Sequence, residues 1–143
     1  MSNSSGMAFR LEVVVVPVAD VDRAREFYES CGWHLDVDHD AGSEFRVVQF
    51  TPPGSACSIT FGLGLGHDMT PGSIKGLHLV VADITAARAD LVDRGIEVSP
   101  IRHMSPDGWQ DGVDPAHGRY NSFADFADPD GNTWVLQEVP EMS

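Results

Sequence analysis

Apolar residues in this chain gather in short runs, and one arrangement of runs occurs twice. The phrase VADVDRAR at residues 18–25 returns as VADITAAR at residues 81–88, an offset of 63 residues. An apolar run precedes each copy, and a glycine follows each aspartate by twelve residues (Gly32 and Gly95). An internal repeat of this kind predicts two copies of one strand–helix module.

The first module is predicted to run strand, helix, strand, strand, strand. Asp20 is expected to cap the first helix by accepting from free backbone N–H groups, and Gly32 to end it in the left-handed conformation. Residues 33–38 alternate apolar and polar side chains, which is typical of a strand with one solvated face. The strands are expected at residues 10–18, 33–38, 44–51 and 56–61.

The second module repeats this order with one insertion. Asp83 is expected to cap its helix, and Asp-Pro-Asp-Gly-Asn at residues 128–132 predicts a hairpin turn before the last strand. The strands are expected at residues 75–82, 96–101, 120–126 and 133–139, with an irregular stretch from His103 to Arg119. A loop of this length predicts a lid or a binding loop.

With 143 residues the chain is expected to form one domain. Residues 1–7 are predicted to be a disordered tail, with Met7 an alternative start. Residues 8–140 are predicted to be a single domain that consists of module one (8–62), a flexible linker (62–73) and module two (74–140).

Charge and composition exclude several classes of partner. Nine Lys and Arg against 22 Asp and Glu give a formal net charge of −13, which repels nucleic acid and anionic membranes. No apolar run approaches the roughly 20 residues of a membrane helix. Without a secretory pattern at the N-terminus, and with only two cysteines, the expected location is cytoplasmic.

The paired modules, with Val-x-Asp after each first strand and Asp-Pro-Asp-Gly-Asn before the last, resemble the vicinal oxygen chelate superfamily. This is the glyoxalase, bleomycin-resistance and extradiol-dioxygenase group, and the resemblance covers roughly residues 8–140. It implies an α+β fold in which two βαβββ modules curl into half-barrels around a small-molecule cleft. It also implies a homodimer, since members usually dimerise and some exchange modules.

Metal-dependent members of this superfamily hold one divalent ion with His and Glu side chains on the first and last strands of each module. The matching positions lie seven residues before the repeated aspartate and four residues after the turn glycine. Here they carry Val13, Ser58, Gly76 and Val135, none of which is a competent ligand for a divalent ion. The prediction is therefore no cofactor, with a divalent metal disfavoured but left open as an alternative.

Residues two positions along a strand share its face. The resemblance therefore also directs Thr60, His78 and Gln137 into the cleft, and among these His78 is the one strong ligand type. Three roles stay open for His78: a structural histidine, a residue that orients a ligand, or a general base. His34, Asp36 and Asp38 alternate and are predicted to share a solvated strand face.

The inserted stretch carries aromatic and charged side chains suited to covering an organic ligand, although a plain surface loop fits it equally well. Trp109 and Tyr120 are expected to stack on the ligand, and Arg119 to pair with an anionic group. The predicted ligand-binding set is Ser58, Thr60, His78, Trp109, Arg119, Tyr120 and Gln137.

These expectations favour a metal-independent protein that binds a small organic molecule. The alternative is an enzyme: a glyoxalase-like lyase or dioxygenase with displaced ligands, or a metal-free isomerase that uses His78 as base. A third interpretation is a domain with a vestigial cleft that serves protein association.

Overall fold

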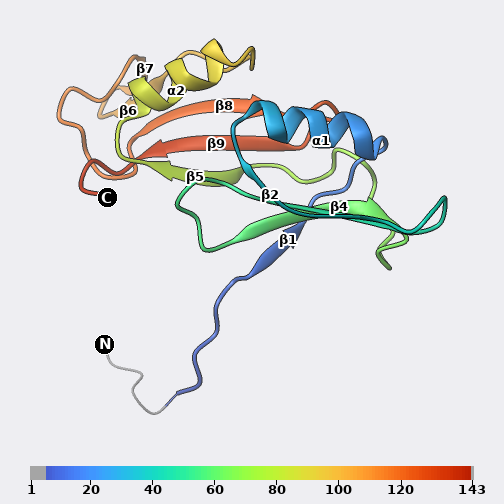
Figure 1. Ribbon diagram of the computed structural model, residues 1–143. Helices are drawn as coiled ribbons and strands as arrows, with labels where there is room; N and C mark the ends of the chain where they lie inside the picture. The colour runs from blue at the N-terminus through green and yellow to red at the C-terminus, as the bar shows by residue number, and fades with distance from the viewer. Residues whose placement is uncertain (1–5, 143) are drawn as a thin grey trace.

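The computed structural model describes residues 6–142, whose strands form two sheets, one for each module (Figure 1). The predicted tail at residues 1–7 lies outside this range except for Gly6 and Met7, which are exposed. The first module comprises β1 (Val13–Val15), α1 (Val21–Ser30), β2 (His34–Asp40), β3 (Arg46–Thr51) and β4 (Ser58–Leu63). The second comprises β5 (Leu77–Val81), α2 (Ile84–Asp93), β6 (Arg102–Ser105), β7 (Gly108–Asp111), β8 (Ser122–Ala127) and β9 (Thr133–Glu138).

Apart from β7, which is added at one edge of the second sheet, both sheets have the same topology, and this confirms the predicted pair of βαβββ modules. The strand order is β1-β4-β3-β2 in the first sheet, called sheet A, and β5-β9-β8-β6-β7 in the second, called sheet B. In each sheet the first strand pairs in parallel with the last, and the other pairs are antiparallel. The sheets remain open and do not close into one barrel.

The two helices begin and end where the repeated phrase predicts. Asp20 accepts from the backbone N–H of Arg23, and Asp83 accepts from that of Ala86, so each aspartate satisfies one free donor of its helix. Gly32 and Gly95 follow the helices with φ of 84° and 88°, a conformation that favours glycine. The predicted caps and glycine stops are confirmed.

The strand predicted at residues 96–101 is wrong, because the strand of the second module begins at Arg102. Arg88 of α2 donates to the carbonyl oxygens of Val98 and Ser99, at 3.0 and 2.7 Å, and Pro100 has no N–H to give to a ladder. The stretch predicted to be irregular instead starts with the hairpin of β6 and β7. Its length therefore reflects an added strand as well as a loop.

A β-bulge in β2 separates Asp36 from Asp38. Leu35 lies opposite Phe50 and Val37 opposite Gln49, so the register shifts between Leu35 and Val37. The predicted common face of His34, Asp36 and Asp38 is wrong, because one extra residue turns the rest of the strand over. Asp38 thus lies opposite the core residue Val48, and the hydrogen bond from Arg46 lowers the pKa of its carboxyl group.

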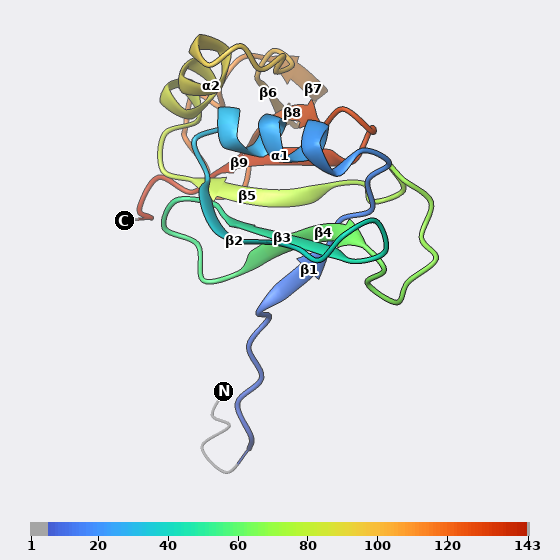
Figure 2. The same cartoon turned by 45° about the vertical axis from the view of Figure 1, so that its right-hand side comes forward.

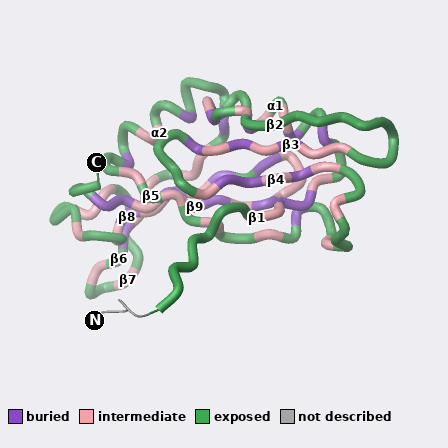
Figure 3. Tube along the Cα trace, turned by 60° about the horizontal axis from the view of Figure 1, so that its bottom comes forward, coloured by how far each residue is buried: buried purple, intermediate pink, exposed green. Residues whose placement is uncertain are grey.

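Helix α1 contacts both sheets and joins the modules (Figure 2). The ring of Tyr28 is fully buried and lies 5.7 Å from that of Phe61 in sheet A and 6.1 Å from that of Trp134 in sheet B. Buried residues follow β3, β4, β8 and β9, whereas the segment before β1 is exposed (Figure 3). The modules therefore share one core on the sides of the sheets that carry the helices.

Replacing Gly72 with alanine is expected to lower the free energy of unfolding by about 3 kcal/mol. Gly72 has a φ of 80°, and an added Cβ would collide with the carbonyl oxygen of Asp130. Gly66 has a φ of 84° and open space around it, so Gly66→Ala carries only the backbone strain, about 1 kcal/mol. Urea denaturation of both variants checks this, and equal losses would contradict packing of Gly72 against the turn of module two.

Candidate functional site

The side of sheet B that faces away from the helices, called the outward face of sheet B, collects aromatic and polar side chains from five strands. Residues opposite one another in a ladder share a face, and so do residues two apart on a strand. His78 pairs with Val135, Val80 with Gln137, and Gln137 with Phe123, while Ala124, Phe126, Trp134 and Leu136 point to the core. The outward face carries His78, Val80, Arg102, Met104, Trp109, Phe123, Asp125, Val135 and Gln137.

At one end of this face, Arg102 lies against two aromatic rings. Its guanidinium carbon is 5.3 Å from the ring centre of Trp109 and 5.7 Å from that of Phe123, within the range of a cation–π interaction. The carboxylate of Asp125 accepts from both terminal nitrogens of Arg102, at 2.7 and 3.3 Å. The ion pair holds the guanidinium in place, while Trp109 leaves 54% of its surface exposed.

On the two strands at the other edge of the face, β5 and β9, His78 and Gln137 form a hydrogen-bonded pair. The amide nitrogen of Gln137 donates to the carbonyl oxygen of Tyr120 at 3.0 Å, so its amide oxygen is directed to Nδ1 of His78, 2.8 Å away. Nδ1 must then be the donor, which leaves Nε2 of the exposed imidazole free to accept a hydrogen bond. The arrangement suits the orientation of a donor group on a ligand.

The loop between β7 and β8 is hydrogen-bonded to β9 beside His78 and Gln137. The N–H of Tyr120 donates to the carbonyl oxygen of Glu138, and Nδ1 of His117 lies 2.9 Å from the buried carboxylate of Glu138. His117 and Tyr120 adopt positive φ values of 49° and 62°, which these contacts sustain. The other oxygen of Glu138 accepts from the N–H of Ile84 at the start of α2.

Within this loop, Asp114 organises the backbone. Its carboxylate accepts from the side chain of Asn121 and from the N–H groups of Ala116 and Gly118. The pKa of Asp114 is lowered by these hydrogen bonds, that of Asn121 first. The loop therefore has a fixed shape beside the outward face of sheet B.

On the outward face of sheet A, hydroxyl and carboxylate side chains hydrogen-bond within the sheet. The hydroxyl group of Thr51 donates to Asp36 and lies 2.5 Å from the hydroxyl oxygen of Ser58, so Ser58 donates to Thr51. The hydroxyl group of Thr60 donates to the carbonyl oxygen of Val48. Both Ser58 and Thr60 thus use their protons within the sheet.

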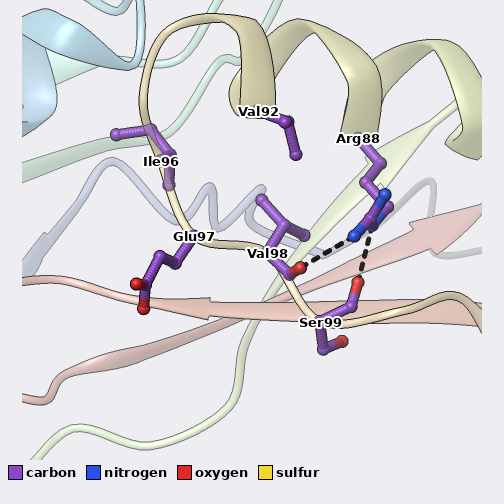
Figure 4. Close-up of a pocket in the computed structure, with 6 residues that line it drawn as sticks. All are labelled: Arg88, Val92, Ile96, Glu97, Val98 and Ser99. Atoms are coloured by element: carbon purple, nitrogen blue, oxygen red, sulfur yellow. Dashed lines mark hydrogen bonds between the residues drawn. The ribbon is translucent and has the colours of Figure 1, made fainter.

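The two outward faces belong to separate sheets. Within residues 6–142, no hydrogen bond or ion pair joins a side chain of one outward face to the other, and the modules meet through the opposite sides. Two surface hollows lie elsewhere, around Arg88 and residues 96–101 and 111–113. Figure 4 shows Arg88 in the first hollow, where its hydrogen bonds to Val98 and Ser99 occupy the guanidinium group.

The structure brings four of the predicted ligand-binding residues together, places two on the other sheet, and leaves Arg119 beside Tyr120 but paired with Glu141. His78, Trp109 and Gln137 share the outward face of sheet B, and Tyr120 adjoins it through its carbonyl group. Ser58 and Thr60 lie on sheet A. Arg119 forms an ion pair with Glu141 and stacks on Tyr120, 5.5 Å from the ring centre, so its charge already has a partner.

Sequence reasoning missed Arg102, Phe123 and Asp125. Phe123 and Asp125 lie two residues apart in the predicted strand 120–126 and therefore share a face. Because the turn at residues 128–132 sets the register of the hairpin, the sequence could have placed Phe123 opposite Gln137 and Asp125 opposite Val135. Arg102 carried no such signal, since its strand was predicted to end at residue 101.

The positions of the superfamily's metal ligands do not fit a metal ion. Val13 lies opposite Ser58 in the β1–β4 ladder, as expected, whereas Val135 lies opposite His78 and not opposite Gly76. Valine, serine and glycine side chains at these positions offer no ligand for a divalent ion, and His78 is the one competent donor beside them. Within the described part of the chain, no three His, Cys, Asp or Glu side chains converge on a common point. No chemical step can be assigned to a metal with this set of donors.

Residues 10–136 match the family described as the Glyoxalase/Bleomycin resistance protein/Dioxygenase superfamily, so the chain belongs to this superfamily. It is similar to TnmS3, an antibiotic binding protein from Streptomyces sp. CB03234, at 31% identity over 93% of this chain and 98% of that one, with a TM-score of 0.70. A glyoxalase/bleomycin resistance protein from the same organism is 31% identical over 90% of this chain and 99% of that one (TM-score 0.66).

A member of the superfamily from Sphaerobacter thermophilus DSM 20745 is 26% identical over 92% of this chain and 98% of that one (TM-score 0.68). No curated protein matches the chain. Neither helix in residues 6–142 has the length and apolar character needed to cross a membrane.

Proposed function

We propose that this protein binds a small organic molecule with a planar aromatic part, without a metal ion, on the outward face of sheet B. The observation that carries the proposal is the group of Arg102, Trp109 and Phe123 beside the His78–Gln137 pair. Apolar walls with a few fixed polar groups are the usual composition of a ligand site.

Each part of the face has a role in this proposal. A planar ring stacks on the exposed indole of Trp109, whose other contacts are already fixed by Arg102 and Phe123. Nε2 of His78 accepts from a hydroxyl or amide group of the ligand. Because Asp125 holds Arg102, the site is assembled before the ligand arrives, which reduces the entropy lost on binding.

The similarity to an antibiotic binding protein supports binding of an organic molecule. The valines, serine and glycine at the superfamily's ligand positions support a metal-independent site. The expected partners are the small molecule and a second copy of the chain in a homodimer. The expected location is cytoplasmic.

A second candidate function is a metal-free isomerase with His78 as the base. The observation that favours it is the hydrogen bond between Nδ1 of His78 and the amide oxygen of Gln137, which fixes the exposed imidazole and leaves Nε2 to a substrate. His78→Ala separates the two functions. A binding protein loses affinity in this variant, whereas an isomerase loses turnover and retains binding.

Thermal-shift measurements with aromatic antibiotics, hydroxy acids and thioester metabolites test the proposal. A ligand that binds only the folded protein raises its melting temperature. At a ligand concentration of 100 times the Kd, the added stability is about 2.7 kcal/mol. We expect aromatic compounds to raise it, equally with and without a chelator, and elemental analysis to find no stoichiometric divalent metal. A shift that disappears with the chelator would refute the metal-independent site.

A further inference from the structure

The loop between β7 and β8 contacts both faces of β9. Gln137 and Glu138 are consecutive residues of β9, so their side chains point to opposite faces of sheet B. On the outward face, the carbonyl oxygen of Tyr120 accepts from the amide nitrogen of Gln137 at 3.0 Å. On the other face, Nδ1 of His117 lies 2.9 Å from the carboxylate of Glu138. The loop therefore reaches around the end of β9 (Figure 1).

The contact of His117 with Glu138 is buried on the side of the carboxylate. Glu138 is 2% exposed, and its second side-chain oxygen accepts from the N–H of Ile84 at the start of α2. Because a carboxylate only accepts, Nδ1 of His117 must donate. A hydrogen bond to an ionised acceptor is stronger than one between two neutral groups. This contact therefore holds His117 against β9.

The backbone of His117 and Tyr120 requires this contact to keep its conformation. Their φ values of 49° and 62° lie in the left-handed region, which strains any residue that has a Cβ. The N–H of Tyr120 donates to the carbonyl oxygen of Glu138, but one backbone hydrogen bond is comparable to the strain of one such residue and does not offset two. Without the bond from His117 to the carboxylate, we expect the loop to relax and the carbonyl group of Tyr120 to move.

The position of that carbonyl group decides which nitrogen of His78 carries the proton. A carbonyl oxygen only accepts, so Gln137 must present its NH2 group to Tyr120 and its oxygen to His78. Nδ1 of His78 then donates, and Nε2 of the neutral ring is left as an acceptor. A ligand with a hydroxyl or N–H group finds a partner there, whereas a ligand with only an ether oxygen leaves Nε2 without one.

We infer that His117 and Glu138 are positioning residues that set the specificity of the ligand site. They hold the loop so that Tyr120 orients Gln137, and His78 then selects planar aromatic molecules that carry a hydroxyl or N–H group. The selection of ligands rests on the proposed function, whereas the position of the proton on His78 is a property of the ligand-free protein.

Heteronuclear NMR of the imidazole nitrogens tests the inference in the ligand-free protein, at about pH 8.5, where a histidine of ordinary pKa is neutral. His78→Ala identifies the signals of His78, and Gln137→Met shows them when the ring has lost its partner. We expect the proton on Nδ1 in the parent protein and largely on Nε2 in Gln137→Met.

Two variants of His117 separate its contact from its backbone conformation. His117→Gly permits the same φ but removes the ring, so the signals of His78 are expected to shift towards those of Gln137→Met. His117→Asn places an amide nitrogen where Nδ1 lies and tolerates a positive φ, so it is expected to keep the parent signals. The side chain of His117 is 58% exposed, so both variants leave the core intact.

Calorimetry with resveratrol, an elongated planar molecule with hydroxyl groups at both ends, and with its fully methylated ether supplies the second readout. The parent and His117→Asn are expected to prefer resveratrol about tenfold, and His117→Gly only about twofold, because an unpaired Nε2 no longer penalises the ether. The comparison between variants removes the effect of the methyl groups themselves.

A proton that stays on Nδ1 of His78 in His117→Gly, or parent-like selectivity in that variant, would overturn the inference. Loss of the parent signals in His117→Asn would do the same. Signals that follow the variants while neither probe binds would support the positioning role and count against the proposed function. Binding of resveratrol with unchanged signals in His117→Gly would support the ligand site and reject the role of His117.

Discussion

Replacing Asp128 with alanine is expected to lower the free energy of unfolding by about 4 kcal/mol, more than any other single change in the turn of residues 128–132. Asp128 is 4% exposed and its carboxylate accepts four hydrogen bonds. They come from the hydroxyl group of Tyr28 and the side chain of Asn132, both at 2.8 Å, and from the N–H groups of Asp130 and Asn132, both at 3.0 Å.

This carboxylate joins the two modules. Tyr28 belongs to α1 of module one and also accepts from the indole N–H of Trp134, while Asn132 donates to the carbonyl oxygen of Pro17. Burial, together with the charge of Asp128, raises the pKa of Tyr28 far above its ordinary value, so its hydroxyl group always remains a donor. In the alanine variant these donors stay buried without an acceptor.

Asp130→Ala is the matched control. Within residues 6–142, the side chain of Asp130 accepts a single hydrogen bond, from the exposed N–H of Ala19 at 3.2 Å, so its loss is expected to cost about 1 kcal/mol or less. Urea denaturation followed by circular dichroism measures both variants. An Asp128→Ala protein within 1 kcal/mol of the parent would contradict the role of this turn as the junction between modules.

Trp109→Ala is expected to weaken binding of an aromatic ligand about tenfold or more, because it removes the stacking surface and one of the two rings that hold Arg102. Trp109→Phe keeps a ring and should lose less. Met104→Ala lies on the same face without an aromatic group and serves as the control. Isothermal titration calorimetry gives the affinities. An unchanged Kd in Trp109→Ala would show that the ligand does not bind at Trp109.

Folding stability provides a check on this variant. Since Trp109 is 54% exposed, its removal should change the melting temperature of the ligand-free protein little, whereas Trp33 and Trp134 lie in the core at 8% and 3%. A loss of affinity with normal stability therefore reports on the ligand face alone.

The repeat predicted most of the fold because its signals are local. Asp20 and Asp83 cap helices through their own side chains, and Gly32 and Gly95 stop them through their own backbone. These preferences depend on neighbours in the chain, so the sequence is sufficient to locate them.

The remaining features depend on contacts that are distant in sequence. The prediction of a strand at residues 96–101 was wrong because Arg88 donates hydrogen bonds to two carbonyl groups of this segment. The bulge at Asp36 depends on the pairing of β2 with β3. Asp128 reads as a turn residue, and nothing near it shows that Tyr28, a hundred residues earlier, is its partner.

The candidate site was predictable in part for the same reason. His78 and Gln137 follow from strand alternation and the superfamily's register. Trp109 joins this face only through the added hairpin of β6 and β7, which the sequence did not predict, so Arg102 was not foreseen. Ser58 and Thr60 were wrongly grouped with Trp109, because they lie on the other sheet.

The intrinsic fluorescence of the chelator-treated protein, titrated with an aromatic compound that raises its melting temperature, tests the ligand face most directly. Of the chain's three tryptophans, only Trp109 lies on this face. We predict saturable quenching in the parent protein and its disappearance in Trp109→Phe, in which the compound still binds by calorimetry. Full quenching in Trp109→Phe, or binding that depends on an added divalent metal, would contradict a metal-independent ligand site on the outward face of sheet B.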